Sequence, residues 1–296
     1  REYGASRLEY KMFGEDGADS FNGVDLRCAQ TPSFNFHQPT QNTHLRDLFS
    51  RDMQLACGQP STRGDHYHLY INGVYWGMYQ TQENIEGDFA QDYLGGDKDD
   101  FDVIEKKKHG YSIDGNEDAY AELWGITNDG YASNANYYKA QGLNPDGVTP
   151  NPAYPKLLDV DNLMDYMLIT YYTGEKDGPA SVWATVNNYA TIINRENPDG
   201  FKHFEYDSEW SLGIGVENVV GPINKSQWSQ LNHFNGHYLH EQLVDNAEYR
   251  VAFADRVHKR MFNDGLMTAT EAIAMLQVRA DEIDTAIIAE TARWGD

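Results

Sequence analysis

An Asn-Gly pair stands between two runs of β-branched and aromatic residues in the first third of the chain. The runs are HYHLYI at residues 66–71 and VYWGMYQTQE at residues 74–83, with Asn72 and Gly73 between them. A two-residue hairpin loop needs positive φ angles, which Asn and Gly tolerate best. The sequence therefore predicts an antiparallel hairpin over residues 66–83, and a purely helical fold is excluded.

Apolar residues recur at helical spacing in several other segments. Residues 42–58 predict a helix that Asn42 or Thr43 caps and Gly58 ends. Asp159 or Asp161 is expected to open a buried helix that Gly174 stops. Further helices are predicted at residues 117–127, 237–264 and 268–294, the last capped by Thr268 or Thr270, with Ala272, Ile273, Leu276, Ala280, Ile283 and Ile287 on one apolar stripe.

The remaining segments complete an α+β outline. Residues 128–155 are rich in Asn, Gly and Pro and predict a long surface loop or a linker. Residues 186–194 and 200–210 predict two strands joined by the turn at 195–200. We expect a single domain over residues 1–296, with a β-rich lobe at 1–110, a connecting loop region at 111–155 and a mainly helical lobe at 156–296.

The composition excludes several classes of function. The 46 acidic residues exceed the 23 Lys and Arg, so the formal net charge is −23 and general nucleic-acid binding is not expected. The chain has no run of about 18 apolar residues, which predicts no transmembrane segment. Its two cysteines, Cys28 and Cys57, could form one disulfide, but two free buried thiols are favoured, and they do not support a structural zinc site.

A pair of carboxylates near residue 207 raises the question of a metal site. In HFEYDSEWSLG, Asp207 and Glu209 are two residues apart at the end of a predicted strand, so both side chains are expected on one side. Two converging carboxylates repel each other unless a cation or a donor lies between them. Taken alone, the same triplet also fits an exposed strand end, because acidic residues are frequent throughout this chain.

The order of several motifs is more specific than any one of them. LRDLFSRDMQL is followed by HLYINGVYWGMYQTQENIEGDFAQDYLGGD, then by MDYMLITYYTGEKD, NNY and HFEYDSEWSLG. In this order, and across nearly its whole length, the chain closely resembles the CotH family of spore-coat atypical protein kinases and their secreted bacterial relatives. The resemblance implies a reduced, kinase-like, two-lobed fold that uses ATP and Mg²⁺ or Mn²⁺ to phosphorylate hydroxyl groups of a protein substrate.

The resemblance also implies roles for individual residues. Asp177 in TGEKD matches the catalytic aspartate, which would orient or accept the proton of the substrate hydroxyl. Asn188, or its neighbour Asn187, matches an asparagine that helps to hold metal. Asp207 matches the metal-binding aspartate, and Glu209 matches the second acidic position of that motif.

Four further residues are candidates for the nucleotide site. Glu83 matches an acidic position of the family and either pairs with a basic residue in the cleft or begins a helix. Arg46 either binds phosphate or carboxylate or forms a structural pair with Asp47, and Arg27 carries the same two interpretations. Lys106, in a run of three lysines, is the candidate phosphate contact, although such a run also fits a solvated face.

The chain departs from the family pattern at several points. The Arg-Gly-x-Ser-Ser type segment of the family does not occur in it, and the chain is expected to be a processed or trimmed piece of an extracellular or cell-surface protein. The motif at 207 is Asp-x-Glu where many members have Asp-x-Asp. The alternatives are a kinase-fold transferase that moves AMP or glutamate, and a non-enzymatic module that holds Ca²⁺ and binds a surface or matrix partner.

Overall fold

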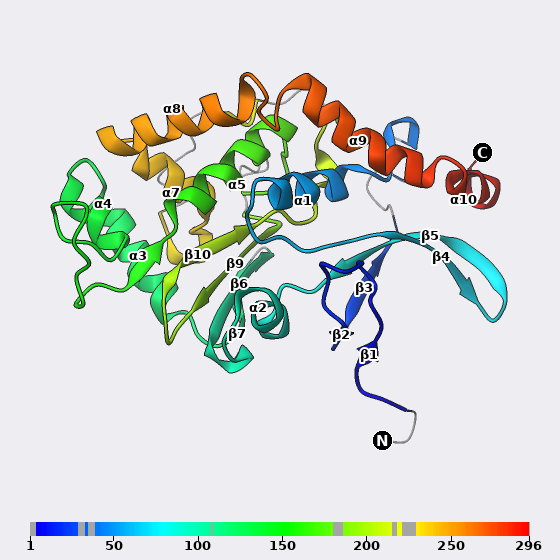
Figure 1. The fold of residues 1–296 in the computed structure, drawn as a ribbon, viewed down its shortest axis with the longest axis horizontal. Coiled ribbons are helices and arrows are strands. Elements are labelled where there is room, and N and C mark those ends of the chain that lie inside the picture. Colours follow the sequence, from blue (N-terminus) through cyan, green and yellow to red (C-terminus); the bar gives the residue numbers. More distant parts are fainter. Residues whose placement is uncertain are drawn as a thin grey trace.

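The computed structural model describes residues 4–28, 33–34, 39–107, 109–179, 186–214, 218–220 and 229–295, without the side chains of 106, 107 and 109–111. Its helices and strands form an α+β fold (Figure 1). The strands are β1 (Leu8–Glu9), β2 (Ser20–Phe21), β3 (Val24–Arg27), β4 (His66–Ile71), β5 (Val74–Glu83), β6 (Phe101–Lys107), β7 (His109–Asp114), β8 (Lys156–Leu158), β9 (Tyr189–Asn194) and β10 (Asp199–Phe204).

The helices of the described residues include the predicted segments and two further helices, α2 and α4. They are α1 (Arg46–Ala56), α2 (Gly87–Leu94), α3 (Asp118–Asp129), α4 (Asn134–Ala140), α5 (Val160–Thr173), α7 (Gly236–Leu243), α8 (Ala247–Met261), α9 (Ala269–Ile283) and α10 (Ala286–Trp294). Short 3-10 turns occur at η1 (Pro39–Gln41), η2 (Lys98–Asp100), η3 (Ser208–Trp210) and η4 (Leu231–His233). Every helix in this part of the chain is too short or too polar to span a bilayer.

The predicted hairpin is confirmed. β4 and β5 are antiparallel, and the two turn residues have the positive φ angles expected of an Asn-Gly loop, 52° at Asn72 and 77° at Gly73. β3 pairs with the other edge of β5, so that Arg27 lies opposite Gln80. The hairpin projects from the body of the molecule, and α10 lies beside its outer half, where the Met78 N–H donates to Glu290 (Figure 1).

A five-stranded sheet joins distant parts of the sequence. Its strand order is β7-β6-β9-β10-β8, and Phe101 of β6 lies opposite Asn194 of β9. The predicted pairing of the strands around 186–210 is confirmed as the antiparallel pair β9–β10. β6 precedes residue 111 and β9 follows residue 155, so the β-rich and the helical stretches of the sequence share one sheet.

The helix ends confirm some predicted caps and correct others. The Asp159 side chain caps α5 by accepting from the Asn162 N–H, and Gly174 ends α5 in the left-handed conformation. Thr268 caps α9, also as predicted. At α1 the prediction was wrong: Leu45 is the first flanking residue and makes no side-chain cap, since Asn42 and Thr43 bond within the preceding turn, to His44 N and Leu45 N.

Two other expectations are corrected at the level of whole segments. Residues 128–155 are not simply a surface loop or linker, because α4 forms within them and Tyr131, Tyr137 and Ala140 are buried in the main core. The predicted helices at 237–264 and 268–294 each divide into two. Ile273 is 63% exposed, so it does not belong to the buried stripe of α9.

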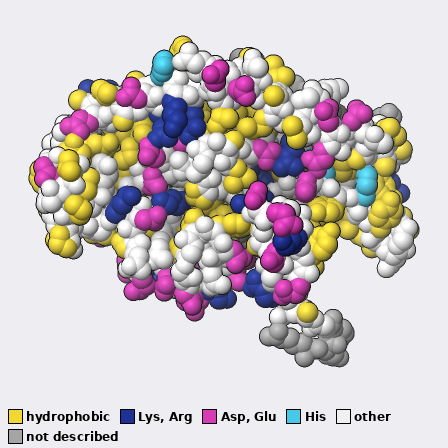
Figure 2. Space-filling model, in the orientation of Figure 1, with side chains coloured by type: hydrophobic (Ala, Val, Ile, Leu, Met, Phe, Trp, Pro, Cys, Tyr) yellow, Lys and Arg dark blue, Asp and Glu magenta, His cyan; other side chains and the backbone are white. Residues whose placement is uncertain are grey.

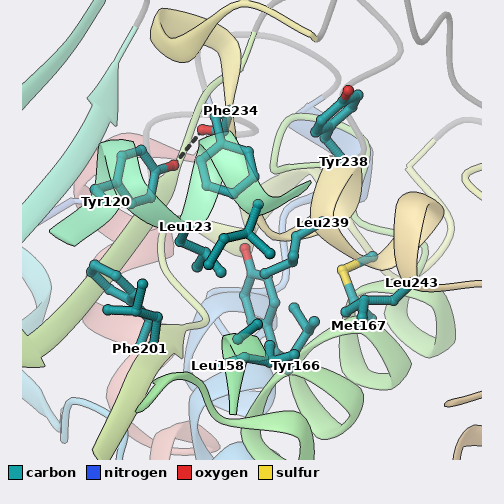
Figure 3. Packing of buried hydrophobic residues seen from close by; sticks show 14 of the residues in the cluster. Tyr120, Leu123, Leu158, Tyr166, Met167, Phe201, Phe234, Tyr238, Leu239 and Leu243 are labelled. Carbon is teal, nitrogen blue, oxygen red and sulfur yellow. Dashed lines mark hydrogen bonds between the residues drawn. The ribbon is translucent and has the colours of Figure 1, made fainter. Parts of the chain in front are cut away.

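The main hydrophobic core lies where α3, α5 and α7 meet the five-stranded sheet (Figure 3). The Tyr120 hydroxyl of α3 donates to the backbone oxygen of Phe234, just before α7, which joins two segments far apart in the sequence. Both cysteines are free, as favoured, but only Cys57 is buried, while Cys28 is exposed. The hydrophobic core packs against α5, β9 and β10, and it therefore fixes the positions of the loops that adjoin these elements.

Candidate functional site

Three of the predicted site residues lie in the loops that adjoin the end of α5, the start of β9 and the end of β10. Asp177 follows the left-handed turn at Gly174, and Asn188 directly precedes β9. Because β9 and β10 are antiparallel, the start of β9 lies beside the end of β10, which Asp207 follows. The Asn188 side-chain amide is 3.4 Å from Asp177 Oδ2 and 3.4 Å from the backbone oxygen of Asp207. The structure therefore brings Asp177, Asn188 and Asp207 together.

Asp207 and Glu209 do not share a strand, which corrects the predicted extent of β10. This strand ends at Phe204, Asp207 is left-handed with φ 58° and ψ 38°, and the 3-10 turn η3 begins after it. Positive φ is uncommon for an aspartate and is a backbone strain of the kind that functional sites hold. The two carboxylates nevertheless converge, through the turn and not through strand alternation.

The cation between these two carboxylates is Arg27. Its Nη2 forms an ion pair with Asp207 Oδ1 and lies 3.4 Å from Glu209 Oε1. Arg27 ends β3, about 180 residues earlier in the chain, as the separation of the hydrogen-bonded pair shows. No local pattern could have identified this partner, since only the pairing of β3 with β5 places it here. All three side chains are partly exposed, so the contact is open to exchange with other ions.

Asp47 anchors the turn that carries Asp207 and Glu209. It is buried, accepts from the Ser208 N–H at 3.0 Å and pairs with Arg51 at 2.9 Å. Burial opposes ionisation, but the charges of Arg51 and Arg27 outweigh it and hold the pKa of Asp47 below its usual value. The predicted alternative of an Arg46–Asp47 pair is wrong, because Arg51, one helical turn away, takes that place.

Two buried carboxylates beneath the site were missed by the sequence analysis. Glu175 Oε1 accepts from the Asp177 N–H at 2.6 Å, and its Oε2 has no hydrogen-bond partner among the described residues. Burial raises the pKa of Glu175 well above its usual value, and that of Glu205 to about 8. Glu175 lies two residues before Asp177 in GEKD, and Glu205 lies two residues before Asp207 in FEYD. Nothing in the sequence around them showed that their side chains are buried.

Asp177 has the electrostatic character of a base. Burial raises its pKa, as does the negative charge of Asp207, while hydrogen bonds from Asn187 and Asn188 oppose the rise. A carboxylate whose pKa moves toward neutrality accepts a proton more readily than an ordinary one. The amide groups fix its orientation, so the arrangement can hold an acceptor hydroxyl next to a carboxylate.

The other three predicted site residues do not belong to this cluster, although Arg46 borders it. Glu83 accepts from the Arg63 N–H at 2.7 Å and from the Tyr93 hydroxyl, so its partners are local. Arg46 lines a hollow together with Arg27 and Glu209, and so borders the cluster. Lys106 lies on β6, but its side chain is outside the described residues.

The donor atoms of the cluster suit a hard divalent cation. Asp207, Glu209 and Asn188 offer the carboxylate and amide oxygens that Mg²⁺, Mn²⁺ and Ca²⁺ prefer. Glu175 adds an unpartnered carboxylate oxygen beneath Asp177. Within the described residues no three His, Cys, Asp or Glu side chains are grouped closely enough to hold a metal by themselves. The residues therefore fit an ion that also binds ligands from outside the protein, such as phosphate oxygens.

Comparison with known families agrees with the geometry. The family model described as CotH kinase protein matches residues 7–296, which is nearly the whole chain. None of the curated proteins compared with the chain matches it. Because the family match covers the α1 segment, the hairpin and the Asp177–Asp207 cluster together, this chain belongs to the CotH kinase protein family.

Proposed function

We propose that this protein is a protein kinase that transfers the γ-phosphoryl group of ATP to Ser or Thr hydroxyls of a protein acceptor, with Mg²⁺ or Mn²⁺. The observation that carries the proposal is the convergence of Asp177, Asn188 and Asp207 from three separate segments. Phosphoryl transfer needs a positioned carboxylate near the attacking oxygen and cations at the phosphates. The cluster supplies the positioned carboxylate and the ligands for the cations.

Each residue has a distinct role in this proposal. Asp177 accepts a hydrogen bond from the acceptor hydroxyl and takes its proton as the new phosphorus–oxygen bond forms and the bond between the γ-phosphorus and the departing ADP breaks. Asn188, Asp207 and Glu209 hold the divalent ion, which neutralises charge on the phosphates when bound. Glu175 fixes the Asp177 backbone through its hydrogen bond. The strained turn at Asp207 directs its carboxylate toward Arg27, beside Glu209, and these two carboxylates would hold the ion.

The nucleotide base has a suitable place beside this cluster. A hollow between the three-stranded and five-stranded sheets is lined by Glu83, Ile85, Glu105, Ala190 and Tyr206. Tyr206 precedes Asp207, and Ala190 follows Asn188 by two residues. The apolar side chains suit a flat base, and the carboxylates suit its amino group and the ribose hydroxyls, whereas they would repel phosphates. Glu83 would therefore contact the nucleotide here.

The proposal includes a kinase-like, two-lobed arrangement and an extracellular or cell-surface location. In it, the three-stranded sheet and α1 belong to the smaller lobe, and α5 with the later helices forms the larger one. The family match supports a kinase-type transferase. Transfer of AMP instead of phosphate remains the alternative that the same cluster could perform, and it is an outcome of the experiment below.

The decisive experiment follows the stabilisation of the protein by ATP with Mg²⁺ or Mn²⁺. We expect a rise in the melting temperature that Asp207→Ala abolishes. The control is Glu196→Ala, an exposed carboxylate in the turn at the far end of the β9–β10 hairpin, and it should respond like the unaltered protein. Protein labelled from γ-labelled ATP indicates phosphorylation, and label from α-labelled ATP indicates AMP transfer. An absence of any nucleotide effect would contradict the proposal.

A further inference from the structure

The hairpin of β4 and β5 carries no formal charge. Residues 66–82 contain no Asp, Glu, Lys or Arg, although charged residues make up 23% of the chain. The segment of α10 that lies beside the hairpin, residues 285–295, adds one acid and one base, Glu290 and Arg293. Together the two segments have no net charge, in a protein whose formal net charge is −23, so the excess negative charge belongs to the rest of the molecule.

The outer end of the hairpin exposes large apolar and aromatic side chains. Ile71 lies opposite Val74, directly before and after the Asn-Gly turn. These two side chains, with Tyr70 and Trp76, are 40–60% exposed. Figure 2 shows hydrophobic side chains at the right-hand end of the molecule, where Figure 1 places the hairpin. Apolar side chains gathered on one projection, without charges between them, are typical of a surface that binds a partner.

Helix α10 holds this projection in a fixed position. The Glu290 carboxylate accepts from the Met78 N–H and from the Tyr75 hydroxyl. The indole N–H of Trp294 donates to the backbone oxygen of Trp76 at 2.9 Å, and the two indole rings meet edge to face with their centroids 6.0 Å apart. A supported hairpin loses little conformational freedom on binding, so a few exposed side chains contribute most of their transfer free energy to the contact.

The shape and the charge of the projection favour a lipid surface over a protein partner. A stable protein interface buries about 800 Å² on each side and depends on complementary shape. A narrow hairpin tip offers much less area, whereas a bilayer has no fixed shape and accepts a narrow projection. A second copy of the chain is disfavoured, because each copy brings a net charge of −23 and the two would repel each other.

We propose that the outer end of the hairpin inserts into the interface of a zwitterionic lipid bilayer. Ile71 and Val74 lie deepest, and Tyr70 and Trp76 lie at the level of the headgroups, where an aromatic ring meets apolar chains and its polar group meets water. The Arg293 guanidinium, 5.6 Å from the centre of the Trp76 ring, contacts lipid phosphates at the same level.

Two features limit this insertion. The backbone groups of the Asn-Gly turn need hydrogen bonds, so the hairpin stays within the headgroup region and does not enter the hydrocarbon core. The negative charge of the rest of the molecule is repelled by anionic lipids, so the preferred headgroups are those without net charge. The proposal does not depend on the kinase function, because none of the side chains at this tip belongs to the Asp177–Asp207 cluster.

Flotation with phosphatidylcholine vesicles tests the lipid contact directly. The unaltered protein should float with the vesicles at millimolar lipid. The double variant Ile71→Ser/Val74→Ser should bind about tenfold more weakly, since two apolar side chains no longer insert. The control is Val244→Ser/Val251→Ser, which removes two exposed aliphatic side chains before and within α8, far from the hairpin (Figure 1). Exchange of about 30% of the lipid for phosphatidylserine should weaken binding, most strongly at low salt.

Bromine-labelled acyl chains show which tryptophan lies in the bilayer, because they quench its fluorescence at short range. Quenching of the bound protein should fall at least twofold in Trp76→Phe. It should remain in Trp124→Phe, since Trp124 packs against the main core. Equal quenching in the two variants would refute insertion of the hairpin.

Thermal unfolding of each variant shows whether it is folded, and Tyr70→Ser provides a second test if the double hairpin variant is not. The proposal is refuted if the unaltered protein does not bind phosphatidylcholine vesicles, or if a folded hairpin variant binds them as strongly as the α8 control. Self-association that the hairpin variant abolishes, without vesicle binding, would assign this end to a second copy of the chain and would equally refute the lipid contact.

Discussion

At the scale of single residues, the sequence analysis named Asp177, Asn188 and Asp207 as site residues, and it gave Arg27 as a possible phosphate or carboxylate partner without identifying Asp207 and Glu209 as the carboxylates that it pairs with. Asp177, Asn188 and Asp207 occur in recognisable motifs, and the structure brings them together. Arg27 is equally central, yet it lies on a strand far away in the chain. The need for a cation between Asp207 and Glu209 follows from charge repulsion alone, whereas its identity depends on the tertiary fold.

Replacement of Arg27 tests whether its guanidinium serves as the counter-charge of Asp207 and Glu209. Arg27→Ala should lower the free energy of unfolding by about 1–2 kcal/mol, because two partly exposed carboxylates lose a charged donor. Mn²⁺ should stabilise this variant more than the unaltered protein, since the ion takes the vacated position. Urea unfolding with and without Mn²⁺ measures both effects. An equal response to Mn²⁺ in the two proteins would contradict this interpretation.

His203 should make the stability of the protein depend on pH. It is buried between the rings of Tyr166 and Tyr189, and burial lowers its pKa from 6.5 to about 3. The unfolded chain binds a proton near pH 6.5 and the folded protein does not, so stability falls as the pH decreases from about 6.5 toward 3. His203→Phe should remove about 2 kcal/mol of the stability difference between pH 7 and pH 5.

Urea unfolding at the two pH values measures this difference. The exposed His68 provides a matched control, since His68→Phe should leave the difference as it is in the unaltered protein. A His203→Phe variant that keeps the full dependence on pH would show that other groups are responsible.

At the scale of elements, the sequence correctly predicted those helices, caps and strand pairs that depend on residues close together in the chain. The hairpin at Asn72-Gly73, the cap of α5 and the pairing of β9 with β10 all follow from neighbouring residues. α4 was missed because its stability comes from burying Tyr137 and Ala140, not from helix propensity. The end of β10 was misplaced because Glu205 turns inward to Thr170 and Ser208, contacts that depend on α5.

The cap of α5 is the element-scale feature that fixes the start of this helix. Asp159 Oδ1 accepts from the Asn162 N–H at 2.9 Å, and Lys202 pairs with its other oxygen. Asp159→Ala should therefore lower the free energy of unfolding by about 1–2 kcal/mol. Asp161→Ala is the control, because Asp161 is exposed and contributes only a surface ion pair with Arg256, worth at most about 1 kcal/mol. Equal losses in chemical unfolding would contradict the assigned cap.

At the scale of the whole molecule, the excess of negative charge is the dominant property. Acidic side chains are spread over the face seen in Figure 2, with Lys and Arg in smaller groups between them. With a formal net charge of −23, mutual repulsion opposes the compact state at low ionic strength. The charge is also the basis for the alternative function of a Ca²⁺-holding module. General charge repulsion and specific Ca²⁺ binding can be separated by experiment.

Salt should stabilise the protein without regard to the identity of a monovalent cation. Raising NaCl from about 20 to about 200 mM shortens the range of the repulsion and should raise the melting temperature by about 2–4 °C. KCl should act equally. CaCl₂ at the same ionic strength should exceed NaCl only through Asp207 and Glu209, so Asp207→Ala should remove the excess. A melting temperature that falls or stays constant with NaCl would contradict the repulsion.

The strand order of the five-stranded sheet also bears on how the chain reaches its folded state. One edge of β6 can pair with β7 as soon as β7 has been synthesised. The other edge pairs with β9, which is synthesised only after α3, α4 and α5. During synthesis Val103 and Ile104, both fully buried in the finished protein, therefore remain uncovered while the ribosome adds the 82 residues from the end of β6 at Lys107 to the start of β9 at Tyr189. Pairing across such a long loop is slow. The nascent chain is thus most prone to aggregate between the completion of β6 and the arrival of β9, and a chaperone that acts on it would need to protect this strand.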